Sequence, residues 1–216
     1  FDNILPYLDG TYDIIDFNLI DSNNNIYQTS DGTLDGAFSL LNWYSPGRVI
    51  KAESFIKTRF KSNIHYEDVE LLPKLYLASK KIKHINHPLY YYRDNDEGIT
   101  KSSSHVNTIK TLDSLQYIFN EYIRLFRCTN NHYYALIALQ AYTLLCFNTY
   151  RKCGTQEAFK LIDKYRLELE LIKPKRLPID KQWFGIKLKA FYYSPKIYLL
   201  ANKANSLLKS MRWLKS

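Results

Sequence analysis

The sequence predicts an α/β or α+β fold in which a mixed sheet with short helices is followed by a mainly helical region. Three observations predict it. Over residues 1–104, short strand-like and helix-like segments alternate and are separated by turn residues. Residues 105–216 instead contain long stretches with the apolar spacing of helices. The composition, 46% apolar and 24% charged, is the balance of a globular chain with a core. We therefore divide the chain into two parts, 1–104 and 105–216.

In the first part, β-branched and aromatic runs predict strands, and clusters of Asp, Asn, Ser, Gly and Pro predict the turns between them. Pro73 lies within a clear helical pattern, so we expect it in the first turn of that helix or at a bend. The predicted elements are strands at 13–20 and 26–29 around a turn at 21–25, a helix at 34–43, a turn at 45–47, a strand at 48–51, helices at 53–58 and 67–78, and two strands at 83–86 and 89–93 broken at Pro88.

In the second part, apolar periodicity predicts helices, and Pro174 and Pro178 mark a connection between the last two of them. The 19 tyrosines suit either a Tyr-rich helical core or surfaces that stack on sugars, and composition does not choose between these. The predicted helices span 106–126, 131–150, 155–168 and 196–214.

The net charge of +9 is unevenly distributed along the chain. Residues 1–104 carry 11 Lys and Arg against 14 Asp and Glu, whereas the remaining residues carry 19 against 7. A basic second part attracts anionic partners such as phosphorylated carriers, an acidic membrane surface or nucleic acid.

The three cysteines, Cys128, Cys146 and Cys153, are an odd number without the spacing of a zinc site, which favours a reducing cytoplasm. No run approaches 18 consecutive apolar residues, so we expect neither a membrane span nor a signal peptide.

The strongest chemical signal is the pair Glu67-Asp68 at a predicted helix start. Free backbone N–H groups and the helix dipole keep a carboxylate ionised there, and an ionised carboxylate at the edge of a cleft can act as a general base. Acidic residues are also common in the first turns of ordinary solvated helices, so the pair alone allows both interpretations.

The residues around this pair resemble the second half of family 2 glycosyltransferases. The resemblance covers roughly residues 1–104 and implies the C-terminal, acceptor-binding part of a GT-A fold that transfers sugar with inversion in bacterial surface polysaccharide synthesis. It implies Asp68 as the catalytic base, with Glu67 beside it. It rests on Trp43, Arg48-Val49-Ile50-Lys51-Ala52-Glu53-Ser54-Phe55, Phe60, Tyr66-Glu67-Asp68, Ala78-x-Lys80-x-Ile82 and Ile85-x-x-Pro-Leu-Tyr-Tyr-Tyr-Arg.

The resemblance also implies a nucleotide-sugar donor and a divalent metal, Mg²⁺ or Mn²⁺, whose ligands lie outside this sequence. No glycine-rich phosphate loop is present among the seven glycines, so nucleotide binding must come from elsewhere. We expect the chain to be part of a longer enzyme and to transfer no sugar by itself; donor hydrolysis by this chain would contradict that expectation.

Four further residues are candidates for substrate binding. Trp43 could stack on an acceptor sugar or anchor a helix against the sheet, and Tyr92 could line the cleft or pack in the core. Arg93 could hold a diphosphate or pair with the Glu67-Asp68 carboxylates. His65 lies just before that pair, where it could also be an ordinary exposed histidine. We predict no metal ligands, since the spacing of His84 and His87 directs them to opposite faces of a strand.

Residues 196–216 form a basic stretch with helical apolar spacing, a Trp and no acidic residue. Such a helix could lie on an anionic membrane surface, which suits a cytoplasmic enzyme at the inner face of the membrane with a saccharide or lipid-linked acceptor, or it could simply pack on other helices. The alternative function is a non-catalytic, basic helical interaction or nucleic-acid-binding protein; without a recognised motif we expect no nucleic acid. A homo-oligomer stays possible because a truncated sheet would expose an edge.

Overall fold

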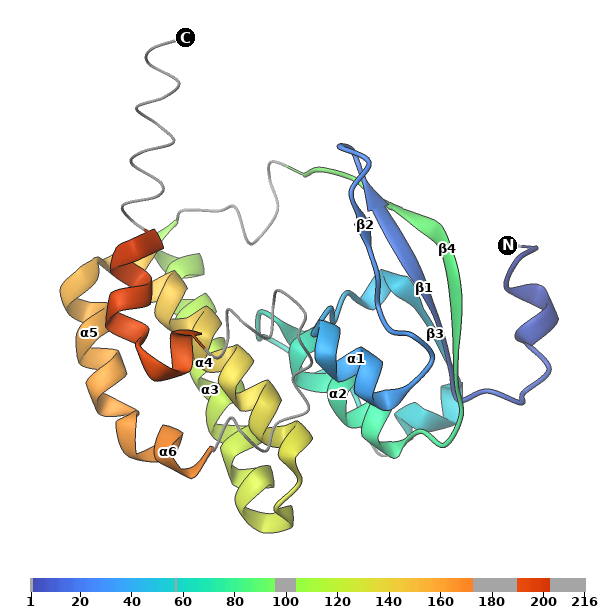
Figure 1. Ribbon diagram of the computed structural model, residues 1–216. Coiled ribbons are helices and arrows are strands. Elements are labelled where there is room, and N and C mark those ends of the chain that lie inside the picture. Colours follow the sequence, from blue (N-terminus) through green and yellow to red (C-terminus); the bar gives the residue numbers. More distant parts are fainter. Residues whose placement is uncertain (1, 57, 96–103, 173–189, 203–216) are drawn as a thin grey trace, which may run out of the picture.

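The computed structural model describes residues 2–56, 58–95, 104–172 and 190–202. It confirms the predicted class: the fold is α+β, with one mixed sheet of four strands followed by helices. Figure 1 shows helices α1 (Leu34–Leu40) and α2 (Glu67–Ala78) lying between this sheet and the long helices of the second part. The predicted connection at Pro174 and Pro178 and residues 203–214 of the predicted last helix lie outside the described residues.

Strand β1 (Ile14–Asp21) is the centre of the sheet. The short strands β2 (Ile26–Tyr27) and β3 (Arg48–Ile50) pair antiparallel with its two ends, and β4 (Ile82–Tyr92) runs parallel to it along its length. β1 is buried on both faces over its first six residues, as expected for a central strand.

The sequence predicted two strands broken at Pro88, but the structure has the single strand β4. Its pairing with β1 is regular up to Phe17 and Ile85, then slips around Asn18 and Pro88 before continuing through Leu19 and Tyr90. Since proline cannot donate a ladder hydrogen bond, the irregular pairing accommodates it without ending the strand.

Helix α2 contains Pro73 in its interior, beyond the first turn where proline is best tolerated. Proline lacks an N–H, so the helix loses one internal hydrogen bond there. The surrounding side chains compensate by packing: Leu71, Leu72 and Leu75 are at most 1% exposed.

The short segments between these elements are 3₁₀ helices at Leu5–Tyr7, Ser45–Gly47 and Ala52–Phe55. Thr33 caps α1: its hydroxyl accepts a hydrogen bond from the N–H of Gly36 at 2.9 Å. The helix is shorter than the predicted range 34–43 because Leu41 adopts a left-handed conformation that ends it.

The second part is built on an antiparallel pair, α3 (His105–Thr129) and α4 (His132–Cys153), followed by α5 (Thr155–Lys164) and α6 (Arg166–Leu171). Ser104 caps α3, so the predicted change of texture at residue 104 coincides with a helix start. Asn130 and Asn131 form the tight connection: the first takes the left-handed conformation that ends α3, and the second caps α4. Residues 190–193 and 195–202 are also helical.

One hydrophobic core joins the two parts. Trp43 illustrates the link, because its indole N–H donates to Gln140 of α4 at 3.1 Å. Tyr76, Tyr122 and Tyr142 are completely buried, so many of the tyrosines serve the core.

Candidate functional site

The carboxylate pair lies at the start of α2, as predicted. Tyr66 precedes it in a left-handed conformation (φ 60°, ψ 36°) and makes no side-chain capping bond. The Asp68 carboxylate accepts a hydrogen bond from the N–H of Val69 at 2.8 Å, which satisfies one free donor of the first turn. Glu67 is exposed and Asp68 is partly buried, so the two neighbours have different surroundings.

Burial makes Asp68 a weaker acid than a solvated aspartate. The pKa of Asp68 is raised from 3.8 to about 6: loss of solvation is the main cause and the Glu67 charge adds to it, while the Val69 hydrogen bond and the Arg48 charge act against it. No ion pair to Asp68 occurs among the described residues. The carboxylate is therefore a stronger base than a solvated aspartate and has no cation bound to it within the described part of the chain.

Tyr44 lines an aromatic pocket. Burial raises the pKa of Tyr44, and the charges of Tyr92 and Asp68 add smaller shifts. Its ring centroid lies 5.9 Å from that of Tyr27 and 5.7 Å from that of Tyr92. These three rings and Asp21 help to line a pocket of about 160 Å³, completed by Leu19 and Asp94.

Asp21 shapes the wall of this pocket. Its carboxylate accepts hydrogen bonds from the Asn25 side-chain amide at 2.9 Å and from the Tyr27 hydroxyl at 2.8 Å. These bonds, the Asn25 amide first, lower the pKa of Asp21 to about 2. The predicted turn at 21–25 therefore fixes the orientation of a pocket tyrosine as well as the hairpin.

A buried polar network holds Tyr44 in place. The guanidinium of Arg48 donates to the Tyr44 and Asn42 carbonyls and, at 2.8 Å, to the hydroxyl of Tyr76. That hydroxyl donates to the carboxylate of Asp16 at 2.6 Å. An arginine is thus linked through a phenol to a completely buried aspartate.

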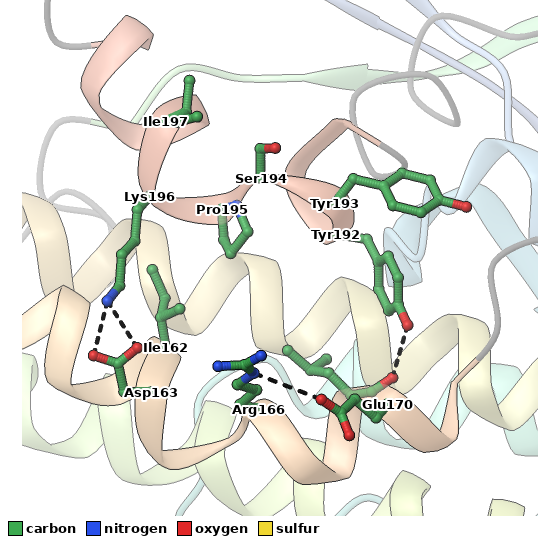
Figure 2. Close-up of a pocket in the computed structure, with 11 residues that line it drawn as sticks. Ile162, Asp163, Arg166, Glu170, Tyr192, Tyr193, Ser194, Pro195, Lys196 and Ile197 are labelled. Carbon is green, nitrogen blue, oxygen red and sulfur yellow. Dashed lines mark hydrogen bonds and ion pairs between the residues drawn. The ribbon is translucent and has the colours of Figure 1, made fainter.

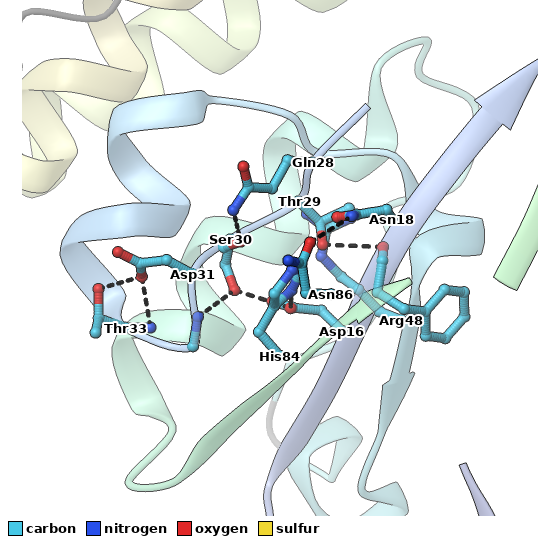
Figure 3. A network of polar contacts seen from close by, with 12 residues as sticks. Asp16, Asn18, Gln28, Thr29, Ser30, Asp31, Thr33, Arg48, His84 and Asn86 are labelled. Atoms are coloured by element: carbon cyan, nitrogen blue, oxygen red, sulfur yellow. Dashed lines mark hydrogen bonds and ion pairs between the residues drawn. The ribbon is translucent and has the colours of Figure 1, made fainter. Parts of the chain in front are cut away.

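The other oxygen of Asp16 is also occupied. Figure 3 shows Ser30 and His84 converging on it, with the Ser30 hydroxyl at 2.8 Å and Nδ1 of His84 at 2.6 Å. The network joins β1, β3, α2 and β4. Its hydrogen bonds hold the side chain of Arg48 in place, although β3 itself is short.

The structure places Trp43 inside the core, where it is 3% exposed. Its ring packs edge-on against Phe38 at 5.0 Å and Tyr76 at 5.5 Å between centroids. The anchoring interpretation describes this position, because too little of the ring is open for a sugar to stack on it. Tyr44, the next residue, has the position on the pocket that the sequence interpretation gave to Trp43.

His65 is also buried, at 7% exposed, and joins the approach to α2 with α3. Its backbone N–H donates to the Ser114 hydroxyl at 2.9 Å, and its ring Nδ1 lies 2.9 Å from the Thr111 hydroxyl. Burial lowers the pKa of His65, which favours the neutral ring at pH 7. It lies near the carboxylate pair in sequence but does not line the aromatic pocket.

Tyr92 lies in the pocket, and Arg93 follows the end of β4 with an exposed side chain. Arg93, Glu67 and Asp68 are all described, and no ion pair joins the arginine to either carboxylate. The structure therefore brings Tyr44 and Tyr92 together, and neither Asp68 nor Arg93 lines their pocket, although the charge of Asp68 acts on Tyr44.

A larger groove, of about 570 Å³, lies between α5 and α6 and residues 192–197 (Figure 2). Its charges are paired with one another: Lys196 with Asp163 at 2.7 Å and Arg166 with Glu170 at 3.5 Å. Because these pairs neutralise the groove, we prefer the smaller pocket lined by Tyr44 as the candidate site.

Residues 196–202 are the described part of the predicted basic C-terminal helix. Leu199 is completely buried, whereas Ile197 and Leu200 are 69% and 46% exposed. The described turns thus pack on the helical region through one side and leave apolar side chains exposed elsewhere.

Comparison with known proteins adds no assignment. No protein-family model matches the chain, and no curated protein matches it in sequence. Among the described residues, no group of three His, Cys, Asp or Glu side chains could hold a metal ion, and no helix is long and apolar enough to cross a membrane.

Proposed function

We propose that this chain is the acceptor side of an inverting glycosyltransferase and that Asp68 is its general base. The observation that supports the proposal best is the state of Asp68: a partly buried carboxylate, with its pKa raised to about 6, whose charge acts on Tyr44 of the aromatic pocket. A base of this strength accepts a proton from a hydroxyl far better than an ordinary aspartate and is still mostly ionised above pH 7.

The aromatic pocket supplies the second half of the argument. Sugars present apolar C–H faces that pack on aromatic rings, and hydroxyl groups that bind carboxylates and phenols. Tyr27, Tyr44 and Tyr92 offer the rings, and Asp21 offers an ionised carboxylate beside them. A pocket of about 160 Å³ suits part of one sugar residue rather than a whole nucleotide sugar.

The proposed reaction is a direct displacement. The acceptor hydroxyl oxygen forms a bond to the anomeric carbon of the donor while the bond from that carbon to the nucleoside diphosphate breaks. The hydroxyl proton passes to Asp68, and the configuration at the anomeric carbon inverts. A divalent metal would neutralise the departing diphosphate, and its ligands would lie outside this sequence.

The test is a titration of the chain, labelled with ¹³C at its aspartate carboxyl groups, with a panel of bacterial oligosaccharides. We expect at least one saccharide to shift the Asp68 carboxyl resonance, and Tyr44→Ala to abolish that shift. Asp113 on α3 is exposed and is the internal control, since its resonance should not move. Saccharide binding that leaves Asp68 unaffected, or no binding across the panel, would count against the proposal.

A further inference from the structure

A second surface, separate from the Tyr44 pocket, combines exposed aliphatic side chains with lysines. It is a groove of about 510 Å³ between residues 61–64 and the first turns of α3. Val106 and Ile109 line its helical wall and are 74% and 47% exposed. Ile64 and Tyr117 add apolar surface, and Phe60, 45% exposed, directly precedes the loop wall.

Cations are placed along the same groove. Nζ of Lys61 lies 3.6 Å from the ring centroid of Tyr117, so its charge is held over an aromatic face at the edge of the groove. Lys110 lines the groove one residue after Ile109, and the exposed Arg59 lies two residues before Lys61. Asp113 is the one carboxylate among the described lining residues, so the surface is basic overall.

The exposed side chains are not required by the core. On α3 the side towards α4 carries Leu115, Ile118 and Phe119, all completely buried. Val106 and Ile109 lie on a different side, where the described residues leave them largely uncovered. Large aliphatic groups next to lysines on an open surface are typical of protein regions that meet the interface of a lipid bilayer.

We propose that this groove docks the chain on an anionic phospholipid bilayer. Lys61 and Lys110 contact lipid phosphates, and the start of an acyl chain lies along Val106 and Ile109. Each lysine near an anionic surface adds attraction, and each buried aliphatic group adds a hydrophobic contribution. The combination favours a membrane over nucleic acid, because phosphates alone would leave the aliphatic wall exposed to water.

The surface is distinct from residues 196–216, for which the sequence itself suggested membrane contact. It also does not depend on the glycosyltransferase proposal, since it uses none of the residues of the Tyr44 pocket. A membrane-bound chain without sugar-binding activity would leave the docking proposal intact, and the reverse holds as well.

The experiment measures binding of the full chain to vesicles of phosphatidylglycerol mixed with phosphatidylcholine, and to phosphatidylcholine alone. We expect binding only to the anionic vesicles. The double variant Val106→Ser/Ile109→Ser should lower the partition coefficient about tenfold. Lys61→Gln and Lys110→Gln should each lower it by about fivefold.

The helical region offers matched controls. Leu167 on α6 is 74% exposed, the same as Val106, so Leu167→Ser removes an equally exposed aliphatic group. Lys164 lies over the ring of Tyr165 at 5.0 Å, as Lys61 lies over Tyr117, so Lys164→Gln makes the same change of charge. Both controls should bind vesicles like the unaltered chain.

A second measurement avoids dependence on variants. The methyl resonances of Val106 and Ile109 should broaden when the vesicles carry a spin-labelled lipid. Three results would overturn the proposal: unchanged binding by the groove variants, loss of binding with the controls alone, or sedimentation showing that these two residues mediate a dimer in the absence of lipid.

Discussion

The raised pKa of Asp68 makes a quantitative prediction about stability. A shift from 3.8 to about 6 is roughly two units, and each unit corresponds to about 1.4 kcal/mol, so ionisation of Asp68 costs the folded state up to about 3 kcal/mol. Asp68→Asn removes this cost, because the amide is neutral and its oxygen can still accept the Val69 hydrogen bond.

The sign follows from the direction of the shift. The folded pKa lies above the unfolded value, so the folded protein is favoured by protonation of Asp68 and loses that stability as the pH rises through about 6. The difference in unfolding free energy between Asp68→Asn and the unaltered chain should be near zero at pH 4. It should approach about 3 kcal/mol in favour of the variant by pH 8.

Urea unfolding at a series of pH values from 4 to 8 measures this difference. Asp113→Asn is the matched control, because its side chain is exposed and the change should stay within about 0.5 kcal/mol at every pH. A variant that is no more stable at pH 8, or a difference that does not change with pH, would refute our description of Asp68.

Three further predictions concern the surrounding structure. Tyr76→Phe removes the hydroxyl between the arginine and the aspartate of the buried network and should destabilise the chain by about 2–3 kcal/mol in urea unfolding, whereas Tyr193→Phe on the surface should have little effect. Leu136→Ala should lower the free energy of unfolding by about 2–5 kcal/mol. Because one core joins both parts, near-UV and far-UV circular dichroism should record the same single transition, and separate transitions would contradict the shared core. The pKa of His65, measured by NMR, should lie below its usual 6.5. The neutral ring then contributes its full stability above pH 6.5, and that contribution declines as the pH falls through the folded pKa. A midpoint at or above 6.5 would show that the ring is well solvated.

Local patterns predicted most of the elements. The strand at 13–20, the turn at 21–25 and the long helices around 106–126 and 131–150 depend on periodicity and turn residues, and the structure has all of them within a few residues. The predicted break at Pro88 was wrong. A proline removes one hydrogen-bond donor, but the irregular pairing that accommodates it depends on the partner strand β1, which no local pattern indicates.

The site was less predictable because it depends on long-range contacts. Trp43 is buried by Gln140, which lies 97 residues later, and no local signal indicates that contact. Tyr44 was missed for the same reason: its place on the pocket follows from Arg48, whose side chain fixes the Tyr44 carbonyl. Asp68 was proposed from the helix start and from the resemblance, and it stays a prediction, whereas the degree of its burial came only from the fold.

The left-handed backbone at Tyr66 has a consequence for ligand binding. This conformation is less favourable by about 1–2 kcal/mol for a residue other than glycine, and Tyr66 adopts it as part of the folded structure. The following two residues leave the turn in a fixed direction before any ligand arrives. In the proposed reaction, an incoming hydroxyl would meet a carboxylate whose turn is already ordered, so binding would require little further ordering of that turn.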